Sequence, residues 1–213
     1  GKHTVQGVLT KALSTVLSSQ IAVTGAGRTD TGVHASFFCA HFDAVRNDLN
    51  NDGQLLYNLN GILPDDIAIK RIVKVNPDAN ARFDAISRTY QYTVTRVKDP
   101  FCADTAWLLY WQLDIDRMNE AAAILLKHSD FTSFCRLHGS NRTNICRVTH
   151  ARWTDEQEKL IFTITADRFL RNMVRAVVRT LIPAGRGKLA LNDFDAILRG
   201  KHRGLAGQSA PAH

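Results

Sequence analysis

The sequence predicts an α+β fold made of two split-βαβ subdomains of the ferredoxin-like type, sharing a mostly antiparallel central sheet with a cleft between them. The first observation is that helical apolar spacing and strand-like alternation follow one another in both halves of the 213 residues. The second is that no repeat, low-complexity tract or coiled-coil heptad interrupts them. Lys98-Asp99-Pro100 interrupts the strand pattern that precedes it. We therefore expect an N-terminal subdomain of residues 1–99 and a C-terminal subdomain of residues 100–213.

The first half is expected to hold two helices and four strands. Apolar residues at helical spacing predict a helix over residues 5–18, almost at the start of the sequence: Val5, Val8, Leu9, Ala12, Leu13, Val16 and Leu17. A second helix is expected over residues 54–60, ending at Gly61. Strand patterns are expected, in chain order, at residues 21–24, 36–42, 67–75 and 89–95. A glycine-rich loop, residues 25–32, joins the first two strands.

The second half repeats the mixture of helices and strands. Met118, Ala121, Ala122, Leu125 and Leu126 recur at helical spacing and predict a helix over residues 116–127. Two strands follow at residues 145–153 and 160–166, joined by the acidic turn of residues 155–158. We expect two further helices, over residues 168–182 and, capped by Asn192, over residues 192–198.

Charge and composition point to a polyanionic partner. The chain carries 27 Lys and Arg against 20 Asp and Glu, which gives a net charge of +7, and most of the excess lies in residues 101–213. The longest apolar run, residues 121–126, is far shorter than the roughly 20 residues that cross a bilayer. The four cysteines form no Cys-x-x-Cys pair, so neither a disulfide framework nor a zinc knuckle is indicated. We expect a soluble cytoplasmic protein with no membrane partner.

The glycine-rich loop holds the most informative cluster of charged residues. Asp30 is preceded by Arg28 and followed by His34 on a segment whose glycines allow sharp turns. On the residues alone, two interpretations stay open: a functional site, or an ordinary turn in which Asp30 caps its own backbone. No Gly-Lys-Ser/Thr ending follows, which excludes a phosphate-binding P-loop. Asp30 and His34 lack a third ligand, so we assign no metal.

The run Gly27-Arg28-Thr29-Asp30-x-Gly32-Val33-His34-Ala35 resembles the signature of the tRNA pseudouridine synthase I family, which modifies uridines 38 to 40. Three further stretches resemble the same family in the same order: residues 81–85 with 88–92, residues 130–134, and residues 169–170 with 173–175. The resemblance implies isomerisation of uridine to pseudouridine in the anticodon stem-loop of tRNA. It also implies no cofactor and a homodimer with tRNA bound across both subunits.

The resemblance implies a role for three side chains. Asp30 is the catalytic aspartate, Tyr90 is the ring stacked against the target base, and Arg175 is the partner of Asp30. A base inside a paired stem must be flipped out before it can react, and an aromatic face suits the flipped base. We assign Arg28, together with Tyr90 and Arg175, to substrate binding.

Arginines form a stripe in the helix predicted over residues 168–182. Arg168, Arg171, Arg175 and Arg179 follow spacings of three and four and would share one face. Such a stripe is often an ordinary solvated surface, but the absence of Lys and of acidic partners favours contacts with Asp30 and the RNA backbone. We therefore assign Arg168 and Arg171 to RNA binding. Arg82 and Arg88 are further candidates for phosphate contacts.

Two alternatives stay open at this stage: a non-catalytic RNA-binding module of the same fold, and a metal-dependent hydrolase built on Asp30 and His34. Family members typically open with a strand and a glycine- and aromatic-rich loop, and close with a strand after a Ser-Ala-Pro-Ala stretch. This sequence starts at the first predicted helix and stops after residues 209–212. We therefore expect it to be incomplete at both ends.

Overall fold

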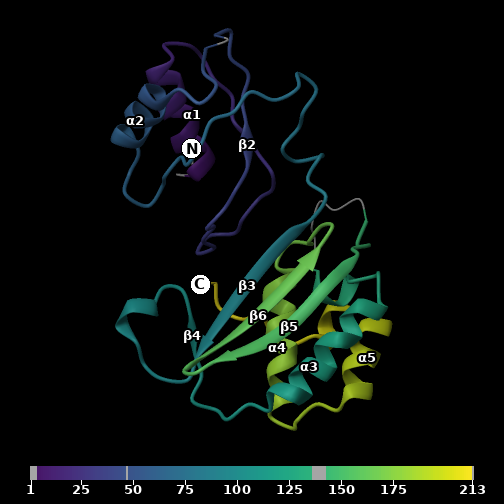
Figure 1. Ribbon diagram of the computed structural model, residues 1–213. Coiled ribbons are helices and arrows are strands. Elements are labelled where there is room, and N and C mark those ends of the chain that lie inside the picture. The colour runs from purple at the N-terminus through teal and green to yellow at the C-terminus, as the bar shows by residue number, and fades with distance from the viewer. Residues whose placement is uncertain (1–3, 47, 136–142, 213) are drawn as a thin grey trace. The chain divides into compact units, whose positions relative to one another are not determined.

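A computed structural model describes residues 4–46, 48–135 and 143–212. The chain forms two compact units (Figure 1), one of Gly1–Arg28 with Ala35–Ala85 and one of Thr29–His34 with Ile86–His213. Helices and sheets occur together in both, which confirms the α+β class. This division differs from the expected boundary between residues 99 and 100, because the strand predicted at residues 89–95 is hydrogen-bonded along its length within the second unit.

The first unit packs two capped helices over a small apolar core. Helix α1 spans Val5–Val16, and the hydroxyl of Thr4 accepts a hydrogen bond from the Gly7 amide at its start. Helix α2 spans Gly53–Ile62, and the Asp52 carboxylate accepts from the amides of Gln54 and Leu55. Both helices are present as predicted. Their buried side chains form the core with those of the neighbouring loops: Ala12, Leu13, Ile21, Val23, Leu49, Leu55, Leu59 and Leu63.

The strands of the first unit are shorter than predicted. Among the residues of this unit that the structure describes, only β1 (Thr24–Gly25) and β2 (Ala40–His41) pair, in antiparallel register. The strand expected at residues 67–75 is wrong, because that segment forms no ladder. Side chains bond to its backbone instead: the Asn60 amide donates to the Ile69 carbonyl at 2.9 Å and accepts from the Ile69 N–H at 2.8 Å. An alternating apolar pattern becomes a strand only where a partner strand is available.

The second unit is built on a four-stranded sheet in the order β4-β3-β6-β5. Strands β3 and β6 and strands β5 and β6 pair antiparallel, while β3 and β4 run parallel. The strands span Arg88–Thr95 (β3), Trp107–Leu108 (β4), Val148–Glu156 (β5) and Lys159–Ala166 (β6). In the described residues the strands thus form two separate sheets, one in each unit, rather than the single shared sheet that was predicted.

Three α-helices lie on one side of this sheet, with two of them packed against its strands and the third against those two helices (Figure 1). They are α3 (Ile115–Ile124), α4 (Met173–Gly185) and α5 (Leu191–Arg199), with short 3-10 turns at Pro100–Cys102, Leu125–Lys127, Thr132–Phe134 and Arg203–Leu205. Alternate residues of β6 point into the core between sheet and helices: Leu160, Phe162, Ile164 and Ala166. Among the described residues, no helix is long and apolar enough to span a bilayer.

Helix α4 starts five residues later than predicted, at Met173 instead of Arg168. Asn172 has φ +66°, a left-handed conformation that a right-handed helix does not contain. The preceding backbone is held by Asp167, whose carboxylate accepts from the amides of Arg147 and Arg168. The four-arginine helical stripe is therefore a wrong prediction, because Arg168 and Arg171 lie before the helix.

An ion pair between α5 and the turn after α3 should make the stability of the second unit pH-dependent. The Asp195 carboxylate lies 2.6 Å from His128 and 2.6 Å from Arg199. The pKa of Asp195 lies below its ordinary value, chiefly because of the hydrogen bond with His128, although partial burial acts in the opposite direction. The contribution of Asp195 to the free energy of unfolding is complete above its unfolded-state pKa and is lost as pH falls through its lower folded-state pKa.

We therefore expect Asp195→Asn to lower the melting temperature at neutral pH and to bring it close to the wild-type value below about pH 3. Thermal denaturation from about pH 6 to about pH 2 measures this convergence. Asp193→Asn, on the exposed first turn of the same helix, is the matched control. A difference between Asp195→Asn and wild type that stays constant with pH would contradict the assignment.

Candidate active site

The loop Thr29–His34, which carries Asp30, belongs to the second unit. Its turn is closed by a hydrogen bond from the Val33 amide to the Asp30 carbonyl, 3.2 Å. Gly32 has φ +84°, and a Cβ at this position would lie 3.1 Å from the Cβ of Ala212. Only glycine meets both conditions without strain. The C-terminal residues therefore pack directly against the loop of Asp30.

The ion-pair partner of Asp30 is Arg171. The Arg171 Nε lies 3.7 Å from the Asp30 Oδ1, with the two side chains 56% and 36% exposed. Arg175, which the family resemblance implied as the partner, instead donates from Nε to the Ala210 carbonyl at 2.6 Å. The expected Arg175–Asp30 pair is thus replaced by an Arg171–Asp30 pair, because Arg171 lies in the turn before α4 and not on the helical face of Arg175.

Tyr90 lies on β3, opposite Ile164 of β6, and is close enough to Asp30 for the two groups to interact electrostatically. Its ring meets the ring of Phe169 edge to face, with centroids 5.0 Å apart and an interplanar angle of 81°. Burial raises the pKa of the Tyr90 hydroxyl, the charge of Arg88 lowers it, and the charge of Asp30 raises it further. The phenol is therefore protonated at neutral pH, and its environment includes the Asp30 carboxylate.

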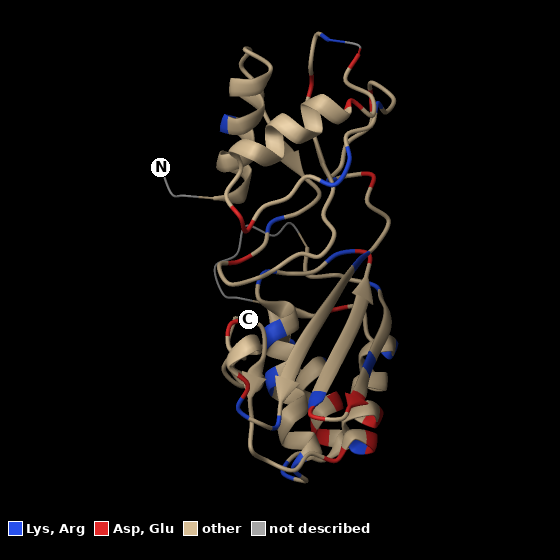
Figure 2. Ribbon diagram, turned by 60° about the vertical axis from the view of Figure 1, so that its left-hand side comes forward, with Lys and Arg blue, Asp and Glu red and all other residues tan. Residues whose placement is uncertain are grey.

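Arg88 and Arg168 lie beside this group at the end of the sheet. The Arg88 Nη1 donates to the Asp167 carbonyl at 2.8 Å, and the Arg168 amide donates to the Asp167 carboxylate at 2.7 Å. Lys and Arg segments lie next to the C-terminal end of the chain in Figure 2. The second unit thus brings together Asp30, Tyr90 and four of the predicted arginines, Arg88, Arg168, Arg171 and Arg175.

Two of the predicted site residues belong to the first unit. Arg28 is exposed. Arg82 is also exposed, and its guanidinium lies 5.9 Å from the ring centroid of Phe83, a cation–π distance. Their assignments to substrate and RNA binding stay predictions.

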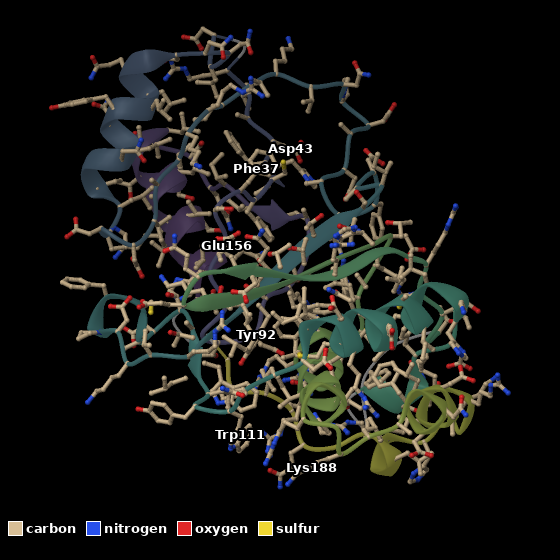
Figure 3. The ribbon with its side chains drawn as sticks, turned by 60° about the horizontal axis from the view of Figure 1, so that its bottom comes forward. Phe37, Asp43, Tyr92, Trp111, Glu156 and Lys188 are labelled. Atoms are coloured by element: carbon tan, nitrogen blue, oxygen red, sulfur yellow. The ribbon has the colours of Figure 1, made fainter. Side chains whose placement is uncertain are left out.

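The C-terminal segment, Ala206–Ala212, borders the Asp30 loop, which the residue patterns did not predict. The Tyr92 hydroxyl donates to the Pro211 carbonyl at 2.9 Å from below β3 (Figure 3), and the Ala210 amide donates to the Arg175 carbonyl at 3.0 Å. Asn172 and Arg203 hold the same segment through Ser209. Apart from glycine, Asn is among the residue types that most readily adopt a left-handed conformation, and this was the available signal for a break at Asn172.

A partly exposed carboxylate beside a guanidinium and an aromatic ring suits chemistry on a nucleobase. The carboxylate supplies a nucleophile or a negative charge, the guanidinium orients it, and the ring offers a stacking face. Asp30 and His34 do not belong to a metal-ligand set in the described ranges, where no group of three His, Cys, Asp or Glu side chains is arranged to hold an ion.

Comparison with known proteins identifies the family of the chain. The sequence model of a family described as tRNA pseudouridine synthase matches residues 121–213. The chain is 50% identical to tRNA pseudouridine synthase A of Bacteroides fragilis over 210 residues, which is 98% of this chain and 83% of that protein. It is 50% identical to the Porphyromonas gingivalis protein of that name, covering 98% and 84%, and 38% identical to the Bacillus subtilis one, covering 100% and 87%. The chain therefore belongs to the tRNA pseudouridine synthase family.

Proposed function

We propose that the protein converts uridine to pseudouridine in tRNA, with Asp30 as the catalytic group. The observation that carries this proposal is the Asp30 carboxylate, paired with Arg171 and near the ring of Tyr90, in a member of a family of tRNA pseudouridine synthases. A protein that only binds RNA gains nothing from a partly exposed carboxylate among arginines, because the carboxylate repels phosphate. The site therefore favours an enzyme over a binding module.

The reaction is an isomerisation, so its atoms balance without a second substrate. The bond between the sugar and ring nitrogen N1 breaks, the uracil turns, and the sugar joins ring carbon C5. The proton on C5 is removed, and N1 ends with a proton. In this proposal Asp30 acts as the nucleophile or the electrostatic stabiliser at the sugar and ring. In the same proposal Tyr90 offers the stacking face for the flipped base.

Tritium release tests the proposal directly. Incubation of the protein with tRNA tritiated at uridine C5 should release tritium to water, because C5 loses its hydrogen when it bonds to the sugar. A chelator should leave this rate unchanged, whereas a metal-dependent hydrolase would be inactivated and would cut or deaminate its substrate. Stable binding of tRNA with no release of tritium would identify a non-catalytic binding module and overturn the proposal.

We further propose that the target uridines lie at positions 38 to 40 of the anticodon arm and that two subunits bind each tRNA. The loop signature around Asp30 and the membership of the chain in the tRNA pseudouridine synthase family support both points. Transcripts whose uridines at 38 to 40 are replaced by cytidine should release no tritium. Sedimentation of the protein at assay concentrations should give the mass of a dimer. A monomer with full activity would contradict the second point.

The affinity for tRNA should fall steeply with salt. The net charge of +7 is concentrated in the second half, and contacts between its arginines and phosphates release counterions. Neutralising about three to five phosphates predicts that the affinity falls by roughly twentyfold to several hundredfold for a fourfold rise in salt. Filter binding from about 50 to 200 mM salt measures this slope. A flat dependence would contradict binding through the RNA backbone.

A further inference from the structure

We propose that Asn172 is a positioning residue, which aims Arg171 at Asp30 through a left-handed turn fixed by Ser209 and Arg203. The inference rests on the proposed function, because it concerns the same carboxylate. The positioning role of Asn172, Ser209 and Arg203 is inferred from the hydrogen bonds that join their side chains.

The guanidinium of Arg171 depends on the backbone for its direction. Its side chain is 56% exposed, so packing restricts its rotamers little, yet its Nε lies 3.7 Å from the Asp30 carboxylate. A long exposed side chain loses conformational entropy when it is held in one place. The direction of the chain at residues 171 and 172 therefore determines how often the guanidinium meets Asp30.

Asn172 sets that direction with an uncommon backbone conformation. Its φ of +66° and ψ of 7° are left-handed, immediately after Arg171 and immediately before α4. Asparagine at the start of a helix usually caps it by accepting from an amide of the first turn. Asn172 makes no such cap, and its Nδ2 instead donates to the Ser209 hydroxyl. The side chain thus ties the turn to the C-terminal segment.

Arg203 fixes the other end of this tie. Its Nη1 donates to the carbonyls of Ala206 at 2.7 Å and Gly207 at 2.8 Å, and its Nη2 donates to the Ser209 hydroxyl at 3.3 Å. One planar guanidinium therefore shapes the segment that presents Ser209 to Asn172. The hydroxyl oxygen accepts from both side chains, and this joins the two into one network.

The C-terminal segment that carries Ser209 also contacts the loop of Asp30. After Ser209, the backbone of Ala210 exchanges hydrogen bonds with Arg175, and Ala212 lies against Gly32. Asp30 is therefore located by Arg171 at its carboxylate and by Ala212 at its loop. Small displacements of a reacting group cost large factors in rate, so loss of the tie should lower turnover more than binding.

The test uses single-turnover tritium release, the Kd for tRNA and the melting temperature. Asn172→Gly keeps the left-handed backbone accessible and removes the amide. We expect it to lower the single-turnover rate about tenfold and to change the Kd by less than about threefold. Ser209→Ala should have the same effect, and Ser209→Thr, which keeps the hydroxyl, should restore most of the loss.

Double variants show whether Asn172, Ser209 and Arg171 act on the reaction together. Asn172→Gly combined with Ser209→Ala should be no slower than either single variant, and Asn172→Gly should cause no further loss when Arg171→Met is already present. Asn192→Gly, in the exposed part of α5, controls for a loss of stability alone. The proposal is overturned if the losses multiply, or if Asn192→Gly slows the reaction as much at the same melting temperature. Absence of tritium release by the wild type would instead reject the proposed function.

Discussion

Replacing Asp30 with asparagine is expected to eliminate pseudouridine formation while tRNA binding changes by no more than a few fold. The amide keeps the size and shape of the side chain but removes its negative charge and its nucleophilicity. The group acts on the substrate in the transition state, so the loss appears in turnover and not in binding. We expect the single-turnover rate to fall by at least about ten-thousandfold, to the limit of detection.

Asp104→Asn provides the matched control, because Asp104 is an exposed aspartate of the same unit. It should keep the wild-type rate and melting temperature. The ion pair of Asp30 with Arg171 is partly exposed, so its loss alone changes stability little. If Asp30→Asn retained more than a small residual rate in the tritium assay, another group would have to carry the chemistry.

The second large effect is expected at Arg175. Its Nε bonds to the Ala210 carbonyl and its carbonyl accepts from the Ala210 amide, so it fixes the segment that lies against Gly32. Arg175→Met removes the bond to Ala210 and one positive charge from the second unit. We expect turnover to fall by at least about a hundredfold with a modest loss of binding. Arg175→Lys should recover only part of the loss, because an ammonium lacks the planar geometry of the guanidinium.

Arg179 offers a control one turn further along α4, where its guanidinium lies 5.1 Å from the ring centroid of Trp107. Arg179→Met removes the same charge from the same helix and should reduce turnover far less. Arg171→Met, measured alongside, compares the ion-pair partner in the structure with the residue that the resemblance implied. Equal rates for Arg175→Met and wild type would mean that the bond between Arg175 and Ala210 is not needed for turnover.

Sequence patterns located the long elements and the reactive loop. Helices α1, α2 and α3 and strands β3 and β6 lie where apolar spacing placed them, because each buries one continuous apolar face. The loop signature around Asp30 and the motifs downstream of it pointed to the family that the comparisons show. Local spacing and a contiguous motif carry this information within the residues themselves.

The tertiary structure alone decided which strands pair and which groups surround Asp30. The apolar alternation of residues 67–75 predicted a strand, but a strand forms only where a partner strand supplies hydrogen bonds, and here Asn60 supplies two. The spacing of Arg168, Arg171 and Arg175 suited a helix, but left-handed Asn172, tied to Ser209 from 37 residues away, ends that periodicity and turns Arg171 to Asp30. Contacts between residues so distant in the chain depend on the fold as a whole, and no local pattern contains them.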